Sequence, residues 1–385
     1  MSPLGNALVA PGGWGEWVES RLSSIAGAGR WRTVRDFDAL GHTGLIDGTQ
    51  VVSFASNDYL GLSHHPEVVD AARAALGRWG AGAGSSRLVV GSRPVHTMLE
   101  EALARWKGTE RCVVFPSGFA ANLGVLTALA NRETGIFSDE LNHASIIDGC
   151  RLARAPTTIY PHRDTEQLAK LLAHASGGRS LIVSDAVFSM DGDAADLPGL
   201  VRLAERFGAL LVVDEAHDVL GNGSIMAEAV SAGLVVRVGT LSKTLGSLGG
   251  FVACSAPIAD LIVNTARSYI FTTALSPPDA AAALAALGVL GSSAGDELLS
   301  RLADHVATLA PGHPSPIVPL VVGNEDDALR AAANLLDRGF LVPAIRPPTV
   351  PDGTSRLRVS LSADHTSGQV QGLLTALRNA GLLLR

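Results

Sequence analysis

The sequence has very little of several residue types that mark specialised classes of protein. Its 385 residues include only three cysteines, Cys112, Cys150 and Cys254, which lie far apart and show no metal-ligand spacing. We therefore expect buried, reduced thiols and no metal site, as is usual in the cytoplasm. A basic surplus is missing as well, because the formal net charge is -7. A nucleic-acid binder needs a basic stripe to neutralise phosphates, so we do not expect nucleic acid among the partners.

Targeting and membrane-spanning segments are also missing from the pattern. The start, "MSPLGNALVAPGGWGEWVES", has neither a basic stretch nor a long apolar stretch, so we expect no signal peptide. The longest apolar run, residues 280–291, is too short to cross a bilayer. We predict a cytoplasmic protein with no membrane partner.

What the chain does have is enough apolar sequence for a large core. Hydrophobic residues make up 47% and charged residues 17%, and the length suits a large domain followed by a smaller one. We predict an N-terminal arm over residues 1–50, with a helix around "WVESRLSSI" and a hairpin in "GLIDGTQVVSFAS". A large domain over 51–280 and a small C-terminal α+β domain over 281–385 would follow.

In the large domain, strand-like runs alternate with helix-like stretches. The strand-like runs are "CVVFPSG", "TGIFSDE", "SLIVSDAVFSMDGD", "ALLVVDEAHD" and "LVVRVGTLSK". Between them lie "HTMLEEALARWKG", "FAANLGVLTALA" and "LPGLVRLAERFG", and "SPPDAAAALAALGVL" begins a long helix with proline in its first turn. This alternation predicts an α/β fold with a mainly parallel sheet covered on both faces. The small domain adds the strands "PIVPLVVG" and "SRLRVSLS" and the helices "DDALRAAANLLDRG" and "GQVQGLLTALRNAG".

Three of the strands run into polar residues. "LIVSDAVFSMDGD" ends in acids and hydroxyls, "LLVVDEAHD" contains Asp214 and His217, and "VVRVGTLSK" supplies Thr240, Ser242 and Lys243. Ligands of open parallel sheets bind beyond the carboxyl ends of the strands, so these groups should converge on one crevice. A single Asp or Lys after a strand is more often a surface charge, but three such strands together favour a site.

Lysine is rare in the chain, which has only Lys107, Lys170 and Lys243. A lysine at a crevice can form a Schiff base with the aldehyde of pyridoxal phosphate, a cofactor that also needs an acid at its pyridine nitrogen and a phosphate cradle. Asp214 can be the acid. "PSGFAANLG", residues 116–124, can be the cradle, because a strand runs into Ser117-Gly118 and a helix opens there. "GAGAGSS", residues 80–86, follows no strand and is interpreted as a flexible loop near the site.

Six motifs together resemble the α-oxoamine synthases. They are "SNDYLGL" (56–62), "PSGFAAN" (116–122), "NHAS" (142–145), "VFSMDGD" (187–193), "DEAH" (214–217) and "TLSK" (240–243). The resemblance covers residue 30 to the C-terminus, with the motifs in the expected order. It implies fold type I of the pyridoxal-phosphate enzymes, like aspartate aminotransferase, and condensation of a small amino acid with an acyl thioester, with loss of carbon dioxide. "IRPPTVPDGTSRLRVSLSADH" (345–365) points to the branch that uses L-alanine and a pimeloyl thioester, on coenzyme A or a carrier protein.

The resemblance implies roles around the cofactor. Lys243 would bind pyridoxal phosphate covalently and act as the general base, and Asp214 would pair with the pyridine nitrogen. His143 would stack on the ring; from the residues alone, a helix-capping or core histidine is favoured two to one. His217 and Ser189 would contact the phenolic oxygen of the cofactor.

The phosphate and substrate residues are implied in the same way. Gly118, Phe119 and Thr240 would hold the phosphate, and Thr272 would reach the cofactor of the second subunit, since the family is homodimeric with its site at the interface. Asn57 and Arg358 would hold the amino-acid carboxylate, although an ordinary strand-surface arginine is the simpler interpretation of Arg358 alone. Arg32 and Thr349 match residues implied in binding the acyl substrate.

One departure from the family pattern is visible. Asp218 stands where the family usually has glycine, and "VLGNGSIM" after it also differs. An added carboxylate near the cofactor could disfavour an anionic acyl group. The alternatives are a family member that uses glycine or serine with another thioester, a catalytically silent partner subunit, and an aminotransferase of the same fold. The first two are weakened by "RPPTVP" and by the presence of Lys243, respectively, and an aminotransferase would leave "RPPTVP" unexplained.

Overall fold

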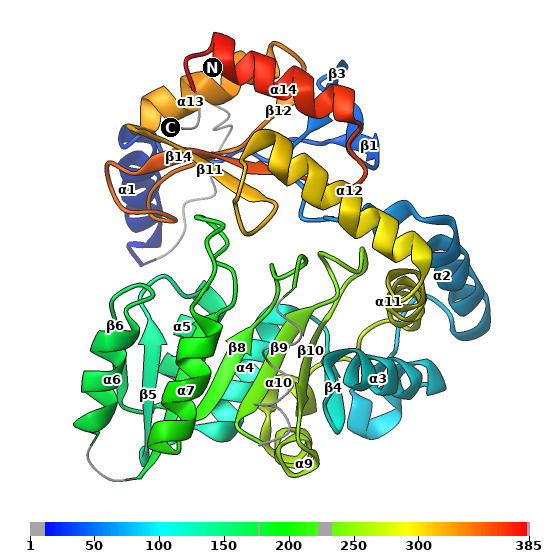
Figure 1. The fold of residues 1–385 in the computed structure, drawn as a ribbon, viewed down its shortest axis with the longest axis vertical. Helices are drawn as coiled ribbons and strands as arrows, with labels where there is room; N and C mark the ends of the chain where they lie inside the picture. The colour runs from blue at the N-terminus through cyan, green and yellow to red at the C-terminus, as the bar shows by residue number, and fades with distance from the viewer. Residues whose placement is uncertain (1–11, 176–177, 222–232, 383–385) are drawn as a thin grey trace.

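Figure 1 shows the computed structural model of the chain, which describes residues 12–175, 178–221 and 233–382. The larger lobe is built on a seven-stranded sheet with the order β4-β10-β9-β8-β7-β5-β6. Its strands are Arg111–Phe115 (β4), Thr134–Asp139 (β5), Thr157–Tyr160 (β6), Arg179–Asp185 (β7), Leu210–Asp214 (β8), Val235–Thr240 (β9) and Gly250–Cys254 (β10). Neighbours from β6 through β9 are parallel, and β10 is antiparallel to both β9 and β4. The predicted α/β fold with a mainly parallel sheet is confirmed.

Helices cover both faces of this sheet because successive strand residues point to opposite sides. Val212 of β8 packs in one apolar cluster with Val125 of α4, whereas its neighbour Leu211 packs in another with Leu200 of α7. The helices of this lobe are Pro94–Lys107 (α3), Gly118–Leu129 (α4), Ala144–Ala153 (α5), Thr165–Ala173 (α6), Leu197–Phe207 (α7), Ala256–Thr265 (α9) and Arg267–Ile270 (α10). The sheet is therefore buried between two apolar layers, and its polar groups are left to the strand ends.

The smaller lobe lies beyond the carboxyl ends of β7–β9 and contains two small sheets (Figure 1). One has the order β1-β2-β3-β12, with strands Asp38–Leu40, Thr43–Ile46, Thr49–Ser53 and Phe340–Leu341. The other has the order β11-β14-β13, with strands Ile317–Gly323, Ser355–Ser360 and Ala344–Ile345. Helices Ser293–Leu309 (α12), Glu325–Leu336 (α13) and Ser367–Asn379 (α14) complete it. The hairpin predicted near residue 45 is present as β2–β3, and it joins a sheet closed by β12 from the far end of the chain.

Two long helices, Pro277–Leu290 (α11) and α12, link the lobes (Figure 1). α11 has Pro277 in its first turn, as the sequence predicts, and its Ser276 side chain accepts from the Asp279 N–H. It packs against Pro66–Trp79 (α2) and meets α12 at an angle of 81°. The sequence analysis names no element over α2 or α12. The division at residues 50 and 280 stays a proposal.

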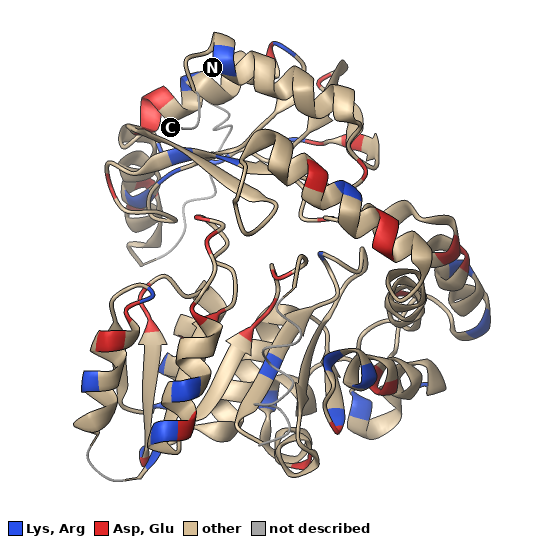
Figure 2. Cartoon of the chain, in the orientation of Figure 1, with Lys and Arg blue, Asp and Glu red and all other residues tan. Residues whose placement is uncertain are grey.

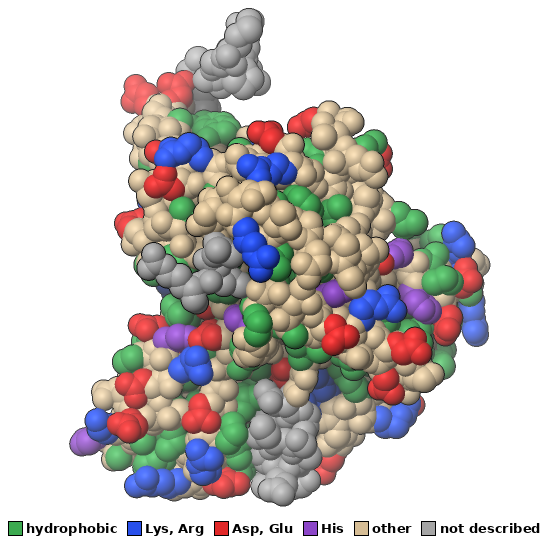
Figure 3. All heavy atoms as spheres, turned by 45° about the horizontal axis from the view of Figure 1, so that its top comes forward, with side chains coloured by type: hydrophobic (Ala, Val, Ile, Leu, Met, Phe, Trp, Pro, Cys, Tyr) green, Lys and Arg blue, Asp and Glu red, His purple; other side chains and the backbone are tan. Residues whose placement is uncertain are grey.

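Short or peripheral elements complete the chain. They are Trp14–Gly27 (α1), Leu62–His64 (η1) and Arg87–Gly91 (η2). No residue of α1 is buried. Among the described residues no single helix is long and apolar enough to span a membrane; only the bent pair α11–α12 meets the criterion, by length and composition. Acidic and basic side chains are interspersed on the face that Figure 3 shows.

Candidate active site

Acidic residues gather where the strands of the large sheet end beneath the smaller lobe (Figure 2). Asp185 and Asp214 are the last residues of β7 and β8, and the parallel register makes them direct neighbours. β9 ends beside them at Thr240, three residues before Lys243. Parallel strands bring their carboxyl ends to one edge, so residues 29 and more positions apart in sequence meet here. The polar groups of the three strands therefore lie together at this edge of the sheet.

Asp214 is held in a fixed orientation. Its buried carboxylate accepts from the Asn122 side-chain amide at 2.6 Å and from the Ala216 N–H at 2.9 Å. Asn122 lies on α4 and also donates to the Ser145 hydroxyl at 2.9 Å. Asn122 was not among the predicted site residues, although it stands in "PSGFAAN", because only its contact with Asp214 marks it.

Lys243, His217 and Tyr59 form a hydrogen-bonded row. The Lys243 amine lies 2.9 Å from His217 Nε2, and the Tyr59 hydroxyl lies 2.6 Å from His217 Nδ1. Burial lowers the pKa of the Lys243 amine, against the opposing charges of Asp214 and Asp185. Burial, reinforced by the charge of Lys243, holds the pKa of His217 well below its usual range. Tyr59, fully buried, is a further residue that the sequence analysis did not single out.

The glycines after Lys243 allow this row to form. Gly246 has a φ of +58°, and a Cβ atom added to it would lie 2.3 Å from the Ser63 backbone nitrogen. The loop of Lys243 therefore lies directly on the backbone of the segment that carries Tyr59. A side chain at this position would separate the two segments, which accounts for glycine in "TLSKTLGSLGG".

His143 and Asp185 stand beside Asp214. The His143 N–H donates to Asp185 Oδ2 at 2.7 Å, and His143 Nδ1 lies 2.7 Å from the Ser145 hydroxyl. His143 is exposed to the crevice, yet the protein around it lowers the pKa of the ring. Burial, together with the nearby charge of Asp214, raises the pKa of Asp185 well above its usual range. We call Lys243, His217, Asp214 and His143 the amine side of the site.

An anion cradle lies at the start of α4. The Ser117 side chain accepts a hydrogen bond from the Ala120 N–H. It does not cap the Gly118 and Phe119 N–H groups, which also lie in the first turn of the helix. A Cβ atom at Gly118 would lie 3.3 Å from Cβ of Thr240, so backbone and hydroxyl are adjacent. The Thr240 hydroxyl also lies 2.8 Å from that of Ser242. The arrangement supplies donors for a phosphate-sized anion.

Arg358 of β14 enters the crevice from the smaller lobe. Its guanidinium donates to Asn57 Oδ1 at 3.2 Å, to the Ser189 carbonyl at 2.5 Å and to the Ser360 hydroxyl at 2.7 Å. The residue is buried, so the interpretation as an ordinary surface arginine is wrong. We call Asn57, Ser189 and Arg358 the arginine side of the site. Its members come from three distant segments of the chain.

The remaining predicted residues are not drawn into this network within the described part of the chain. Arg32 and Thr349 are exposed and Thr272 is half-buried, and none shows a hydrogen bond to another predicted site residue. Asp218 lines a cavity of about 410 Å³ together with Trp106, Lys107 and Thr244, and no predicted site residue lines that cavity. "VLGNGSIM" lies largely outside the described residues.

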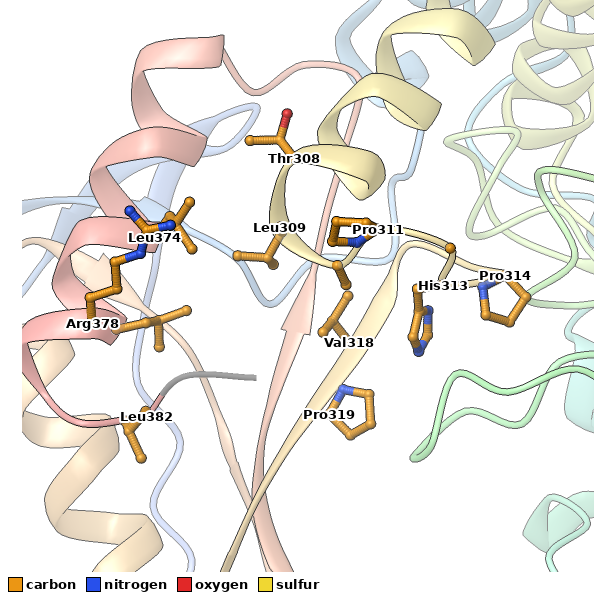
Figure 4. Close-up of a pocket in the computed structure, with 13 residues that line it drawn as sticks. Thr308, Leu309, Pro311, His313, Pro314, Val318, Pro319, Leu374, Arg378 and Leu382 are labelled. Carbon is orange, nitrogen blue, oxygen red and sulfur yellow. The ribbon is translucent and has the colours of Figure 1, made fainter. Parts of the chain in front are cut away.

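A separate cavity of about 640 Å³ lies between the end of α12, β11 and α14 (Figure 4). Its lining is mainly apolar, with His313 and Arg378 as the titratable groups, and it includes none of the predicted site residues. The polar crevice, not this cavity, is therefore the candidate active site.

Known proteins resemble the chain over most of its length. The family model described as "Aminotransferase class I and II" matches residues 49–377. The 8-amino-7-oxononanoate synthase of Anaeromyxobacter dehalogenans is 48% identical over 380 residues, which cover 94% of each chain. A solved structure of "SPT with PLP internal aldimine" is 30% identical, with a TM-score of 0.88 over 98% of this chain and 100% of that one. The solved 8-amino-7-oxononanoate synthase from Francisella tularensis is 27% identical, with a TM-score of 0.72 over 86% and 98%.

Proposed function

The chain belongs to the class I and II aminotransferase family, and from that premise we propose that it condenses L-alanine with a pimeloyl thioester. The products are 8-amino-7-oxononanoate, carbon dioxide and the free thiol, a step of biotin biosynthesis. The acyl carrier is coenzyme A or a carrier protein. The 48% identity to a relative named for this product, over nearly the full length of both chains, supports the choice within the family.

The observation that carries the proposal is the meeting of two chemically different groups on either side of Tyr59. A half-buried amine with a lowered pKa lies on one side and a buried, oriented guanidinium on the other. An amine in its neutral form can attack a carbonyl or remove a proton. A guanidinium can bind a carboxylate through two parallel hydrogen bonds. An α-amino acid presents both kinds of partner.

The described residues fit pyridoxal 5'-phosphate. The buried Asp214 carboxylate, fixed by Asn122 and Ala216, suits a protonated pyridine nitrogen, and the bare backbone at Gly118 beside Thr240 suits a phosphate. Lys243 would hold the aldehyde carbon covalently, and His143 would face the ring. When bound, this cofactor supplies an electron sink that stabilises negative charge at the amino-acid α-carbon. His217 and Ser189 would contact its phenolic oxygen, and Phe119 would help to hold its phosphate.

The residues of the chain then bind, orient and move protons. Arg358 and Asn57 would grip the carboxylate of L-alanine and so set which α-carbon bond stands ready to break. The Lys243 amine would take the α-proton, with His217 Nε2 at 2.9 Å steadying it. This requires that the amino group of L-alanine has first displaced the Lys243 amine. The deprotonated α-carbon would then bond to the thioester carbonyl, and the thiol would leave. Carbon dioxide would then depart from the carboxylate at Arg358, and Lys243 would return a proton to the α-carbon.

We place the acyl substrate against the N-terminal segment and the loop after β13. Arg346 donates to the Gly29 carbonyl at 2.8 Å, and Arg30 pairs with Glu325 at 2.7 Å. These contacts keep the neighbourhoods of Arg32 and Thr349 next to each other. Both side chains are exposed and therefore free to meet an acyl chain.

We also propose a homodimer in the cytoplasm, with the site at the subunit interface. Large apolar side chains are exposed near the cradle, among them Val89 (72% exposed), Phe271 (69%) and Phe119 (43%). Exposed apolar groups of this size are typical of an interface. Thr272, next to Phe271, would then reach the cofactor phosphate of the second subunit. The three free, buried cysteines suit a reducing compartment.

The test is an absorbance spectrum of purified protein, followed by addition of L-alanine and then of pimeloyl-CoA. We expect a cofactor band that shifts with L-alanine and release of free thiol and carbon dioxide when the thioester is added. A response to glycine or serine instead of L-alanine would favour another member of the family. A protein that binds no added pyridoxal phosphate would refute the enzyme and favour a silent subunit.

A further inference from the structure

The loop between β7 and α7, residues 186–196, crosses from the large lobe to the small one. At its tip the Ser189 carbonyl accepts from Arg358 at 2.5 Å, and Asp191 forms an ion pair with Arg356. The Gly192 carbonyl accepts from the Ser315 hydroxyl at 2.7 Å. The position of this loop therefore influences where the Arg358 guanidinium lies.

The fit of the loop against the small lobe is close. Gly192 has a φ of +67°, and an added Cβ atom would lie 1.9 Å from the Ile317 carbonyl oxygen. The loop is closed on itself by three backbone bonds, from the Phe188 N–H to the Asp193 carbonyl, from the Gly192 N–H to the Phe188 carbonyl and from the Ala195 N–H to the Ala186 carbonyl. A loop packed backbone to backbone has little room to shift without moving its contacts.

His162 binds the base of this loop to the end of the sheet. Its Nδ1 lies 3.0 Å from Oδ1 of Asp139, the last residue of β5, and its Nε2 lies 2.9 Å from Asp193 Oδ2, in the loop. The ring also stands edge-on to Phe188, with centroids 4.3 Å apart. Both nitrogens donate only when the ring is protonated, and both partners are carboxylates, which only accept. The geometry therefore suits an imidazolium that bridges two fixed acids.

The surrounding charges favour that protonated form. Burial by itself would lower the pKa of His162, but the hydrogen bonds to Asp139 and Asp193 outweigh it and raise the pKa to about 9. Arg163 also pairs with Asp193, at 3.0 Å, and is the opposing positive charge. The Glu140 carboxylate accepts from the His162 backbone N–H at 2.9 Å and adds a third acid. None of these groups belongs to the amine side or the arginine side.

We propose that protonated His162 is a positioning residue that fixes the 186–196 loop and, through Ser189 and Asp191, the arginines that face it. The contact between His162 and the loop does not depend on what the protein does. Its consequence, that His162 sets how well Arg358 binds an amino-acid carboxylate, rests on the proposed function.

The test compares His162→Gln with His174→Gln in the cofactor-loaded protein. Glutamine is uncharged and cannot donate to both acids as the imidazolium does. His174, an exposed histidine at the end of α6, serves as the matched control. Losing two charge-assisted hydrogen bonds should speed amide exchange in peptides spanning 186–196 about tenfold in His162→Gln. Peptides of α4 should not change, and His174→Gln should match the wild type. Unchanged exchange in the loop would overturn the proposal.

Steady-state kinetics test whether His162 influences amino-acid binding at Arg358. The KM for L-alanine should rise about tenfold in His162→Gln with kcat changed less than about twofold, since Arg358 binds the ground state and transition state alike. His162→Arg, which keeps a charge able to pair with both acids, should recover much of the loss. Faster loop exchange with an unchanged KM would refute the link to Arg358.

Two further outcomes remain decisive. If His162→Gln does not fold, wild-type protein provides the test. Protection of the 186–196 amides from exchange should fall as the pH rises through about 9, while protection of the α4 amides does not. Constant protection of the loop would overturn the proposal. If wild-type protein does not act on L-alanine, the proposed function fails. The exchange data then still decide whether His162 fixes the loop.

Discussion

The two sides of the candidate site are built in different ways. On the amine side, Asp214 ends β8, His217 and Lys243 lie within three residues of the ends of β8 and β9, and His143 caps α5, which follows β5 of the same sheet. On the arginine side, Asn57, Ser189 and Arg358 come from three segments, and Arg358 bonds across 301 and 169 positions of sequence. The amine side is therefore set by the topology of one sheet, whereas the arginine side exists only when the two lobes dock. Damage to the first should abolish chemistry, and damage to the second should weaken binding.

Lys243→Ala should have the largest effect. It removes the covalent attachment and the proposed general base together, so turnover should fall about 10⁴-fold or more. Lys170→Ala, an exposed lysine on α6, is the control and should leave turnover unchanged. Release of thiol from pimeloyl-CoA measures both. Turnover by Lys243→Ala within tenfold of wild type would contradict the role of the amine side.

Arg358→Lys should separate the two sides. A lysine keeps the charge but loses the bidentate fork, so the KM for L-alanine should rise about 10- to 100-fold. The cofactor spectrum should not change, because the amine side stays intact. Arg330→Lys, on the exposed face of α13, is the control. A lost cofactor band in Arg358→Lys would mean that the two sides are not independent.

Tyr59→Phe should have a smaller effect and lies on the boundary between the sides. The hydroxyl lies 2.6 Å from His217 Nδ1 and donates to Asn57 Oδ1 at 3.2 Å. Its removal should lower kcat/KM about three- to tenfold, the worth of one modest hydrogen bond. Tyr160→Phe removes another buried phenol, on β6, and should lower stability without this kinetic change. Equal kinetic losses in both variants would indicate a general effect of a buried hydroxyl.

The smallest expected effect is the pH dependence of stability from His162. Its folded pKa of about 9 lies above its ordinary value of 6.5. Its contribution is therefore complete below about pH 6.5 and is lost as the pH rises through about 9. The His162 side chain is 20% exposed, so solvent weakens this contribution. At pH 6 the free energy of unfolding of the wild type should exceed that of His162→Gln by about 1–2 kcal/mol, and the difference should shrink towards zero by about pH 10. Denaturant unfolding across this range measures the difference, and a constant difference would contradict the bridge.

Much of the fold could be predicted because the strands and helices of the large lobe give recurring patterns of apolar residues in the sequence. Apolar runs of five to seven residues between amphipathic stretches indicate β4, β5, β7, β8 and β9, with α3, α4 and α7, and polar residues at the strand ends indicate where the site lies. Among the elements that were not predicted are β6, β10, α2, α5, α6, α9 and α12, although the apolar residues of α2 and α12 recur at helical spacing. The amine side was accessible for the same reason, because each of its members follows a strand or opens a helix.

The arginine side shows where that reasoning ends. From sequence alone Arg358 is one arginine in a strand, and only its burial and its bonds to Asn57 and Ser189 distinguish it. Tyr59, Asn122 and His162 were missed for the same reason, since what marks each is a partner far along the chain.

The sequence by itself determined the parallel sheet, the order of its elements and the chemistry at the strand ends. Local periodicity and the rule that ligands meet carboxyl ends were sufficient for those. Only the tertiary structure decided which arginine faces the amine, how Tyr59 joins His217, and where the 186–196 loop is anchored. Those contacts depend on the docking of two lobes, and no local pattern encodes the partner of a residue that lies 300 positions away.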